Sequence, residues 1–407
     1  MQGALRTAVV VAALAAALAG CGGSGGTQPG GFTYESTLTV YSDLPLQGPQ
    51  GALMTSIDDG EILALRDAHA RGEDSNVSLA LLNDADSSGW NAKTTADAAR
   101  QAGQDLDAIA YIGDFDSGAT AVAQTITNEN NILQVSPASP YAGLTDSGPF
   151  DQPAEPQSYY PDGKRTLARL VPSDAKEAVA VASFMHDLGV DRLFTLSDGE
   201  PYDGQIAALV GATAPAHGVA LAGSARIPSP AADASLIAKL AASHVNAVFV
   251  GAAPQASVVA LWSRLHAQLP AVKLFAPSTL ATGPFLAAIA GAADTTFVTS
   301  PILPLSQYPA QAQAVLRAYR RAFATAPSAW SLYGYEAMAS VLVAIQRAHA
   351  NPNRRLDVVA DYFALGERHS VIGDYRIDSN GDTSLARFGG YRVGAGGKLI
   401  ERRSLSG

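Results

Sequence analysis

Short apolar runs alternate with longer helical stretches along the chain from Thr37 onward. The runs at 108–113 and 247–251 are rich in Ala, Ile, Val and aromatic residues and contain no charged side chain. Strands have such continuous apolar sequences when helices cover both faces of a parallel sheet, because neither face is in contact with water. The alternation therefore predicts repeated βαβ units and an α/β fold.

The alternation is interrupted once, by a segment at 147–165 that contains four prolines. Its lack of periodicity predicts a long surface loop. A second αβ series begins near Ser173, and three helical stretches follow it at 310–324, 333–350 and 356–366. Two series in tandem predict two doubly wound lobes, whose ligands bind at the carboxyl ends of strands or between domains.

The first residues form a separate unit with the pattern of a secretory signal. Arg6 precedes an apolar run at 7–18, and small residues follow. Cys21, the only cysteine, stands between Leu-Ala-Gly and a glycine-rich stretch, which resembles the lipobox of bacterial lipoproteins. The resemblance implies that residues 1–20 are a signal peptide, that Cys21 is lipidated, and that residues 21–36 are a flexible tether. A short signal anchor with an incidental thiol is the alternative.

This segment predicts an exported protein that the lipid on Cys21 anchors to the outer face of the cell membrane. The net charge of −10 argues against a nucleic-acid partner and against peripheral binding to anionic lipid. Beyond Thr37 no uninterrupted apolar run is long enough to span a bilayer. We therefore expect membrane contact through the lipid and no bound nucleic acid.

Motifs for catalysis and metal binding are missing from the sequence. Outside the glycine-rich stretch at 20–26 it contains no Gly-x-Gly-x-x-Gly and no Gly-x-Ser-x-Gly, it contains no His-Glu-x-x-His, and its seven histidines are scattered. The segment 378–382 begins like a calcium loop, but Thr383 stands where such a loop needs glycine and Gly389 where it needs an acid. We expect a hairpin turn there, and no catalytic residue, cofactor or metal in the protein.

Two loops that precede predicted helices are candidates for ligand contact. The loop at 46–51 allows close backbone approach through its glycines, or is simply a tight turn. The segment at 113–120 follows an apolar strand and opens a helix. Ser117 either caps that helix, or its hydroxyl and the following N–H groups hold a carboxylate.

Several motifs together resemble type I periplasmic solute-binding proteins, and most of all the branched-chain amino-acid (leucine, isoleucine and valine) binding family. The resemblance extends over about 37–402. The residues that carry it are Gly48-Pro49, Gly60, IGDFDSGAT at 112–120, Ser136-Pro137-Ala138, Arg169-x-x-Pro172-x-Asp174, 198–204 around Tyr202, and 375–382.

The resemblance implies two Rossmann-like lobes that a hinge joins around an interlobe ligand cleft. The N-terminal lobe would comprise 37–168 and 303–368, and the C-terminal lobe 169–302 and 369–407. The implied function is capture of a small polar ligand, an amino acid or a related carboxylate or amide, for delivery to the permease of an ABC transporter.

Ligand-binding positions carry over from the family residue by residue. Ser117 with Gly118, and main-chain groups at Ala138 and Ser139, would hold a carboxylate. Tyr202 and Leu53 would line the pocket.

Two positions depart from the family pattern. Pro140 stands where the family often has a threonine that contacts the ligand, and Ser278 stands where amino-acid binders have an acid that pairs with the ammonium. A buried ammonium needs a counter-charge. Unless a nearby acid replaces it, leucine, isoleucine and valine are expected to bind poorly.

Two other functions fit the same features. A lipoprotein of this kind can sense its ligand and signal to a membrane receptor. A surface hydrolase built on Ser117, with a distant histidine and aspartate, is the third alternative. Neighbouring genes for a permease or a sensor kinase, or turnover of a bound ligand, would separate the three.

Overall fold

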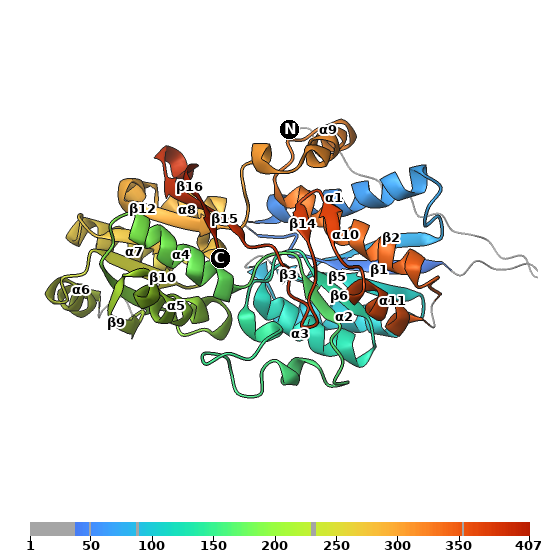
Figure 1. The fold of residues 1–407 in the computed structure, drawn as a ribbon, viewed down its shortest axis with the longest axis horizontal. Helices are drawn as coiled ribbons and strands as arrows, with labels where there is room; N and C mark the ends of the chain where they lie inside the picture. Colours follow the sequence, from blue (N-terminus) through green and yellow to red (C-terminus); the bar gives the residue numbers. More distant parts are fainter. Residues whose placement is uncertain (1–36, 49, 87–88, 229–232, 352–353) are drawn as a thin grey trace, which may run out of the picture. The chain divides into compact units, whose positions relative to one another are not determined.

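The computed structural model describes residues 37–407 except 49, 87–88, 229–232 and 352–353. The predicted signal peptide, Cys21 and the predicted tether lie outside these residues. The described chain forms two large sheets covered by helices (Figure 1). Both are mainly parallel, so the predicted α/β class with two doubly wound lobes is confirmed. None of the described helices is long and apolar enough to cross a membrane.

The first sheet has five parallel strands in the order β2-β1-β5-β6-β7. Helices α2 and α3 cover one face, while α1, α9, α10 and α11 contribute to the core on the other face. The bounds are β1 (Leu38–Asp43), β2 (Val77–Leu82), β5 (Ala108–Ile112), β6 (Leu133–Ser136), β7 (Leu167–Arg169), α1 (Gly51–Ala70), α2 (Ala92–Gln104), α3 (Ser117–Glu129), α9 (Ala310–Phe323), α10 (Trp330–Arg347) and α11 (Arg355–Phe363).

The second sheet has seven strands in the order β16-β15-β12-β11-β10-β8-β9, and only β15 and β16 run antiparallel to their neighbours. Helices α4 and α5 pack on one face and α6, α7 and α8 on the other. The bounds are β8 (Arg192–Ser197), β9 (Ala220–Arg226), β10 (Ala247–Gly251), β11 (Lys273–Ala276), β12 (Thr296–Ser300), β15 (Arg387–Val393), β16 (Leu399–Ser406), α4 (Asp174–Asp187), α5 (Pro201–Thr213), α6 (Asp233–Ala242), α7 (Ala256–Gln268) and α8 (Gly283–Ala288).

Alternating side chains of each strand enter different cores, as the pleat requires. In β10, Val248 and Val250 pack with α7, whereas Ala247 and Phe249 face the core beneath α4 and α5. All five residues of this strand are buried. The sequence run at 247–251 is apolar throughout because helices cover both of its faces.

Helices α1 and α10 approach closely where each carries a glycine. A Cβ on Gly60 would lie 2.1 Å from the carbonyl oxygen of Ser331, and a Cβ on Gly334 would lie 2.1 Å from that of Ile57. Any larger residue would force the two backbones apart. Gly60, which the sequence offered only as part of a family pattern, is therefore a packing residue.

Several of the described elements were not predicted from the sequence, and three segments among them are short strands or hairpins. They are β7 and two small hairpins, one of β3 (Ala85–Asp86) with β4 (Gly89–Trp90) and one of β13 (Arg368–Ser370) with β14 (Gly373–Tyr375). Strands of two or three residues are too short to show a period. The hairpin of β3 and β4 matters for the site, because it carries Trp90.

The chain passes from one sheet to the other after β7, after β12 and before β15. The third passage comes later than the predicted boundary at 368, since Val371, Ile372 and Tyr375 pack in the core of the first sheet. Val171 also packs there, beyond the predicted boundary at 168. The remaining lobe boundaries stay predictions.

The segment at 147–165 contains no strand and no α-helix, but only the short 3-10 helix η2 (Gln157–Tyr159). It is nevertheless fixed to the rest of the protein. Tyr160 is buried and donates to the carbonyl oxygen of Leu144 at 3.0 Å. Gln205 of α5 donates to Asp151 at 2.6 Å, so this segment links the two sheets.

The predicted turn at 378–382 is a hairpin, as expected. An antiparallel bridge joins Ile377 to Thr383, and the Asp378 carboxylate accepts the main-chain N–H groups of residues 380–382. Asp382 extends from this turn to Arg169 at 2.5 Å. The turn therefore positions Asp382 for an ion pair with Arg169, which lies far from it in the sequence.

Candidate functional site

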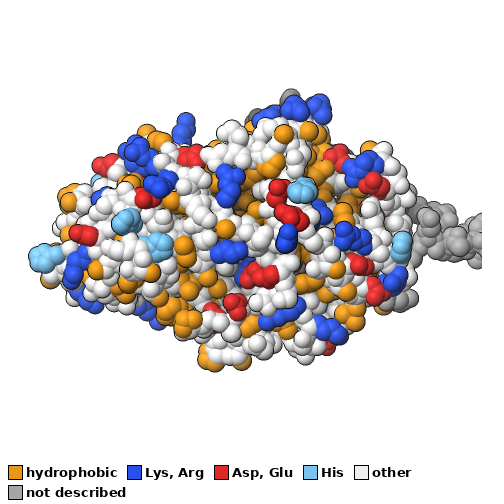
Figure 2. Space-filling view, in the orientation of Figure 1, with side chains coloured by type: hydrophobic (Ala, Val, Ile, Leu, Met, Phe, Trp, Pro, Cys, Tyr) orange, Lys and Arg blue, Asp and Glu red, His pale blue; other side chains and the backbone are white. Residues whose placement is uncertain are grey.

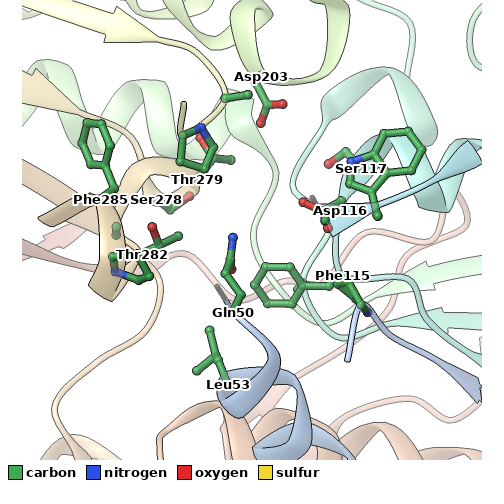
Figure 3. A pocket seen from close by; sticks show the side chains of 18 of the residues that line it. Gln50, Leu53, Phe115, Asp116, Ser117, Asp203, Ser278, Thr279, Thr282 and Phe285 are labelled. Carbon is green, nitrogen blue, oxygen red and sulfur yellow. The ribbon is translucent and has the colours of Figure 1, made fainter. Parts of the chain in front are cut away.

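A cavity of about 450 Å³ is lined by residues from both sheets. Its lining residues follow the carboxyl ends of parallel strands, which is where ligands of such sheets bind (Figure 3). The first sheet contributes loops after β1, β5 and β6, and the second contributes loops after β8, β10 and β11. The cavity lies within the size range of small-molecule sites.

Ser117 is the first residue of α3, and the N-cap is Asp116. The alternative that Ser117 caps the helix is therefore wrong, and no side chain caps this terminus. The Ser117 hydroxyl oxygen accepts the main-chain N–H of Tyr141 at 3.3 Å. That bond does not use the hydroxyl hydrogen, so Ser117, which lines the cavity, can donate to a ligand there (Figure 3).

The other residues expected at the site are only partly brought together. Leu53, Ala138 and Ser278 line the cavity with Ser117, as does Pro140. Gly118, Ser139 and Tyr202 are not among the lining residues. Their positions explain why.

Those three residues contact neighbouring groups of the protein instead. A Cβ on Gly118 would lie 2.5 Å from the Trp90 indole, so the glycine lets Trp90 approach α3. Ser139 is buried and donates to the carbonyl oxygen of Asp114 at 3.1 Å. The Tyr202 ring packs edge-on against Tyr141, with 5.2 Å between ring centroids.

Ser278 is held by a buried acid that the sequence analysis missed. Its hydroxyl donates to Glu177 at 2.5 Å, its main-chain N–H donates at 2.7 Å, and Thr299 donates at 2.6 Å. Burial raises the pKa of Glu177 to about 7, although these hydrogen bonds favour the charged form. Because its hydrogen is used, the Ser278 hydroxyl presents only acceptor lone pairs to the cavity.

Two further acids line the cavity itself, Asp116 from the first sheet and Asp203 from the second. Figure 3 shows both carboxylates directed into the space beside Ser117. Burial first, and then the charges of Asp203 and Asp84, raise the pKa of Asp116 to about 8. Burial likewise raises the pKa of Asp203 to about 7, with contributions from Asp198 and Glu200.

Two acids line the same cavity as Ser278, and they bear on a condition attached to one sequence expectation. Poor binding of leucine, isoleucine and valine was expected only if no acid replaced the one missing at position 278. Asp116 and Asp203 supply such acids. The sequence could not indicate them, because a lone aspartate beside a helix start is an ordinary N-cap.

Aromatic side chains form much of the apolar wall. Phe115 and Trp330 pack edge-to-face, with 5.1 Å between ring centroids. Trp90 and Phe285 also line the cavity. Trp330 begins α10 and lies far from Phe115 in the sequence, so only the fold brings these rings together.

Three buried carboxylates gather behind the first sheet's part of the site. Ligand atoms of Asp43, Asp84 and Asp114 all lie within 4.8 Å of one another, close enough to hold a metal ion. Tyr111 donates to Asp43 at 2.9 Å and to Asp114 at 3.1 Å. Burial, and then the charge of Asp84, raise the pKa of Asp43 to about 8. No sequence motif identified this group, whose members lie at or just after the ends of three different strands.

Among the described lining residues there is no Lys, Arg or His. On the outer face seen in Figure 2, by contrast, positive and negative side chains are interspersed. The excess of acids over bases in the cavity lining is therefore local and does not follow from the net charge of the chain.

Comparison with known proteins identifies relatives of this architecture. A family model described as periplasmic binding protein matches residues 44–384. The leucine-binding protein LivK of Thermotoga maritima superposes with a TM-score of 0.74 at 19% identity, over 91% of this chain and 99% of that chain. No curated protein sequence matches the chain.

Two other solved structures were determined with ligands. An ABC transporter substrate-binding protein of Desulfitobacterium hafniense, in complex with Leu, has a TM-score of 0.73 at 18% identity, over 90% of this chain and 100% of that chain. An ABC transporter solute-binding protein of R. palustris, in complex with benzoate, has a TM-score of 0.69 at 16% identity, over 91% and 97%. At these identities the likeness establishes the fold.

Proposed function

The chain belongs to the periplasmic binding protein family, and on that premise we propose that it captures a small polar solute and delivers it to an ABC transporter. The observation that carries the proposal is the cavity, whose walls come from both sheets. A ligand that contacts both walls stabilises the closed arrangement, because its binding energy is available only when the walls meet. The solved relatives with Leu and with benzoate support a small organic ligand.

Ser117 is proposed to donate to a carboxylate or amide oxygen of the ligand. Its hydroxyl hydrogen is not used in the hydrogen bond with Tyr141, and it stands at the amino end of α3. Ala138 and Leu53 would contact the ligand from the same side. We propose no catalysis at Ser117, since no histidine lies among the described lining residues to act as its base.

The remaining parts of the proposal concern location. We propose that the protein acts outside the cytoplasm and that a lipid on Cys21 anchors it to the membrane. The signal-like residues 1–20 and the glycine-rich stretch after Cys21 support this. Anchoring keeps the binding protein near a membrane permease.

The experiment uses the tryptophans of the protein. Trp90 and Trp330 line the cavity, whereas Trp262 is buried in another core. A thermal-shift screen of amino acids, carboxylates, amides and amines should yield ligands that raise the melting temperature and change the tryptophan fluorescence. The fluorescence change should shrink in Trp330→Phe, and small-angle scattering should show a smaller radius of gyration. A screen in which no compound stabilises the protein contradicts the proposal.

A further inference from the structure

Four groups of the cavity lining can accept hydrogen bonds from a ligand. Asp116 and Asp203 bring two carboxylates, and the Ser278 hydroxyl has given its hydrogen to Glu177. The Gln50 carbonyl oxygen is buried without a partner among the described residues. A ligand that satisfies these groups must supply N–H or O–H donors, and the two acids favour a positive one.

We propose that the ligand carries a protonated amine or guanidinium that binds between Asp116 and Asp203. The proposal rests on the proposed binding function and narrows its ligand class. It differs from capture of a simple carboxylate such as benzoate, for which the described lining residues offer no cationic partner. Ser117 would then donate a hydrogen bond to a neutral acceptor of the ligand, such as an amide oxygen, or to the carboxylate of a ligand that also carries an amine.

The two acids belong to elements of different sheets, so a positive group between them also affects how the two walls of the cavity approach each other. Asp116 follows β5 and Asp203 lies in the first turn of α5. Two carboxylates that face each other repel, and the pKa of Asp116 is raised by Asp203 accordingly, after the larger effect of burial. A cation between them replaces repulsion by two attractions. It therefore favours the arrangement in which both walls contact the ligand.

The rest of the ligand is apolar. Phe115, Trp330, Trp90 and Phe285 line the cavity beside the acids. Their faces accept an alkyl or aryl group by burial, and they also attract a nearby cation. The ligand class is thus an organic amine with a hydrophobic body.

The test compares probes that share a skeleton and differ in charge. We would use 3-phenylpropylamine, 3-phenylpropanol and 3-phenylpropanoate, and the matched set of isoamylamine, isoamyl alcohol and isovalerate. Calorimetry on the full exported chain at pH 8.5 should show that an amine binds at least about tenfold more tightly than its alcohol and its acid, a difference of about 1.4 kcal/mol. Asp116→Asn and Asp203→Asn should each abolish that preference.

Glu200→Gln is the matched control. Glu200 is exposed and influences Asp203, but it does not line the cavity. This variant should keep the preference for the amine. Far-ultraviolet circular dichroism and the melting temperature without ligand would show that each asparagine variant is folded.

The outcomes separate this proposal from the proposed function. Tighter binding of an acid or alcohol, with quenching of the cavity tryptophans, would overturn the charge assignment and leave solute binding intact. A preference for the amine that survives in both asparagine variants would also overturn it. If neither amine binds while other solutes in the thermal-shift screen do, the cationic class is wrong. If no solute binds at all, both proposals fail.

Discussion

The Ser278 hydroxyl donates a 2.5 Å hydrogen bond to the buried carboxylate of Glu177. This contact puts a negative group directly behind a residue of the cavity wall. Glu177 belongs to α4 and Ser278 follows β11, so the pair also joins a helix to the sheet. It explains how a serine can occupy this position while an acid remains nearby.

Ser278→Ala should destabilise the protein more at high pH than at low pH. Burial raises the pKa of Glu177 to about 7, so the carboxylate is charged at pH 8.5 and mostly neutral at pH 5.5. Loss of a hydrogen bond to the charged form costs about 1.5–3 kcal/mol, against about 1 kcal/mol for the neutral form. Urea unfolding at both pH values measures this. Ser257→Ala, on the exposed side of α7, is the control, and equal losses at the two pH values would contradict the prediction.

Asp382→Asn should lower the free energy of unfolding by about 3–5 kcal/mol, because it leaves the buried Arg169 guanidinium without its counter-charge. The Arg169 side chain is 1% exposed. Burial raises the pKa of Asp382, but the charge of Arg169 and hydrogen bonds from Arg169 and Thr145 outweigh it, so the pKa is lowered.

The pH dependence of this pair follows from that direction. An acid with a lowered pKa in the folded state stabilises the protein above its unfolded pKa of about 4 and loses that contribution as the pH falls. Wild type should therefore lose more stability than Asp382→Asn between pH 5 and pH 3. Asp374→Asn, at an exposed surface pair with His369, should change stability by less than about 0.5 kcal/mol. Similar losses in the two variants would refute the assignment.

Asp43→Asn should stabilise the protein at pH 8.5. Burial first, and the charge of Asp84 second, raise the pKa of Asp43 to about 8. Because the pKa of Asp43 is raised in the folded state, the folded protein keeps this proton at pH values where the unfolded chain has released it. Stability therefore falls as the pH rises from about 4 to about 8. The amide removes that loss and can still accept from Tyr111.

The expected gain for Asp43→Asn is on the order of 1–3 kcal/mol at pH 8.5 and close to zero at pH 4. Chemical unfolding across this range gives the comparison. Asp107→Asn is the control, since Asp107 is exposed. A destabilised Asp43→Asn at pH 8.5 would show that a charged Asp43 is needed.

Binding of an organic amine should strengthen as the pH rises from 6 to 8.5. Burial raises the pKa of Asp116 to about 8 and that of Asp203 to about 7, and their neighbours Asp84, Asp198 and Glu200 act in the same direction. A cation binds the charged carboxylates, so binding releases protons at neutral pH.

Calorimetry in buffers of different ionisation enthalpy measures this proton release directly. The release should diminish in Asp116→Asn and in Asp203→Asn, and the affinity should then vary less with pH. An affinity that falls as the pH rises over this range would contradict the prediction, because the amine stays protonated there.

Cys21→Ser should release the protein from the membrane. Acylation of the only cysteine would be lost, and with it the proposed anchor. Fractionation and labelling with a fatty-acid analogue test this, with Ser24→Ala in the same stretch as the control. A Cys21→Ser protein that is still processed, labelled and membrane-bound would refute the lipid assignment.

The sequence by itself determined the α/β class, the two series of strands and helices, and the placement of Ser117 where a strand ends and a helix begins. These follow from local periods and turn chemistry, because burial on both faces leaves a continuous apolar run such as 247–251. The hairpin turn at Asp378 could also be predicted from the sequence, because the Asp378 carboxylate accepts main-chain N–H groups only two and three residues further along the chain.

Only the tertiary structure decided the chemistry of the cavity. Asp116 faces Asp203 from another sheet, and Phe115 contacts Trp330, which lies far along the chain. The periodicity of apolar residues indicates which residues share a face of one helix or strand. It carries no information on which loops of two different sheets lie next to each other. The same holds for Gly60, whose need for a bare backbone arises only because Ser331 of α10 passes over it.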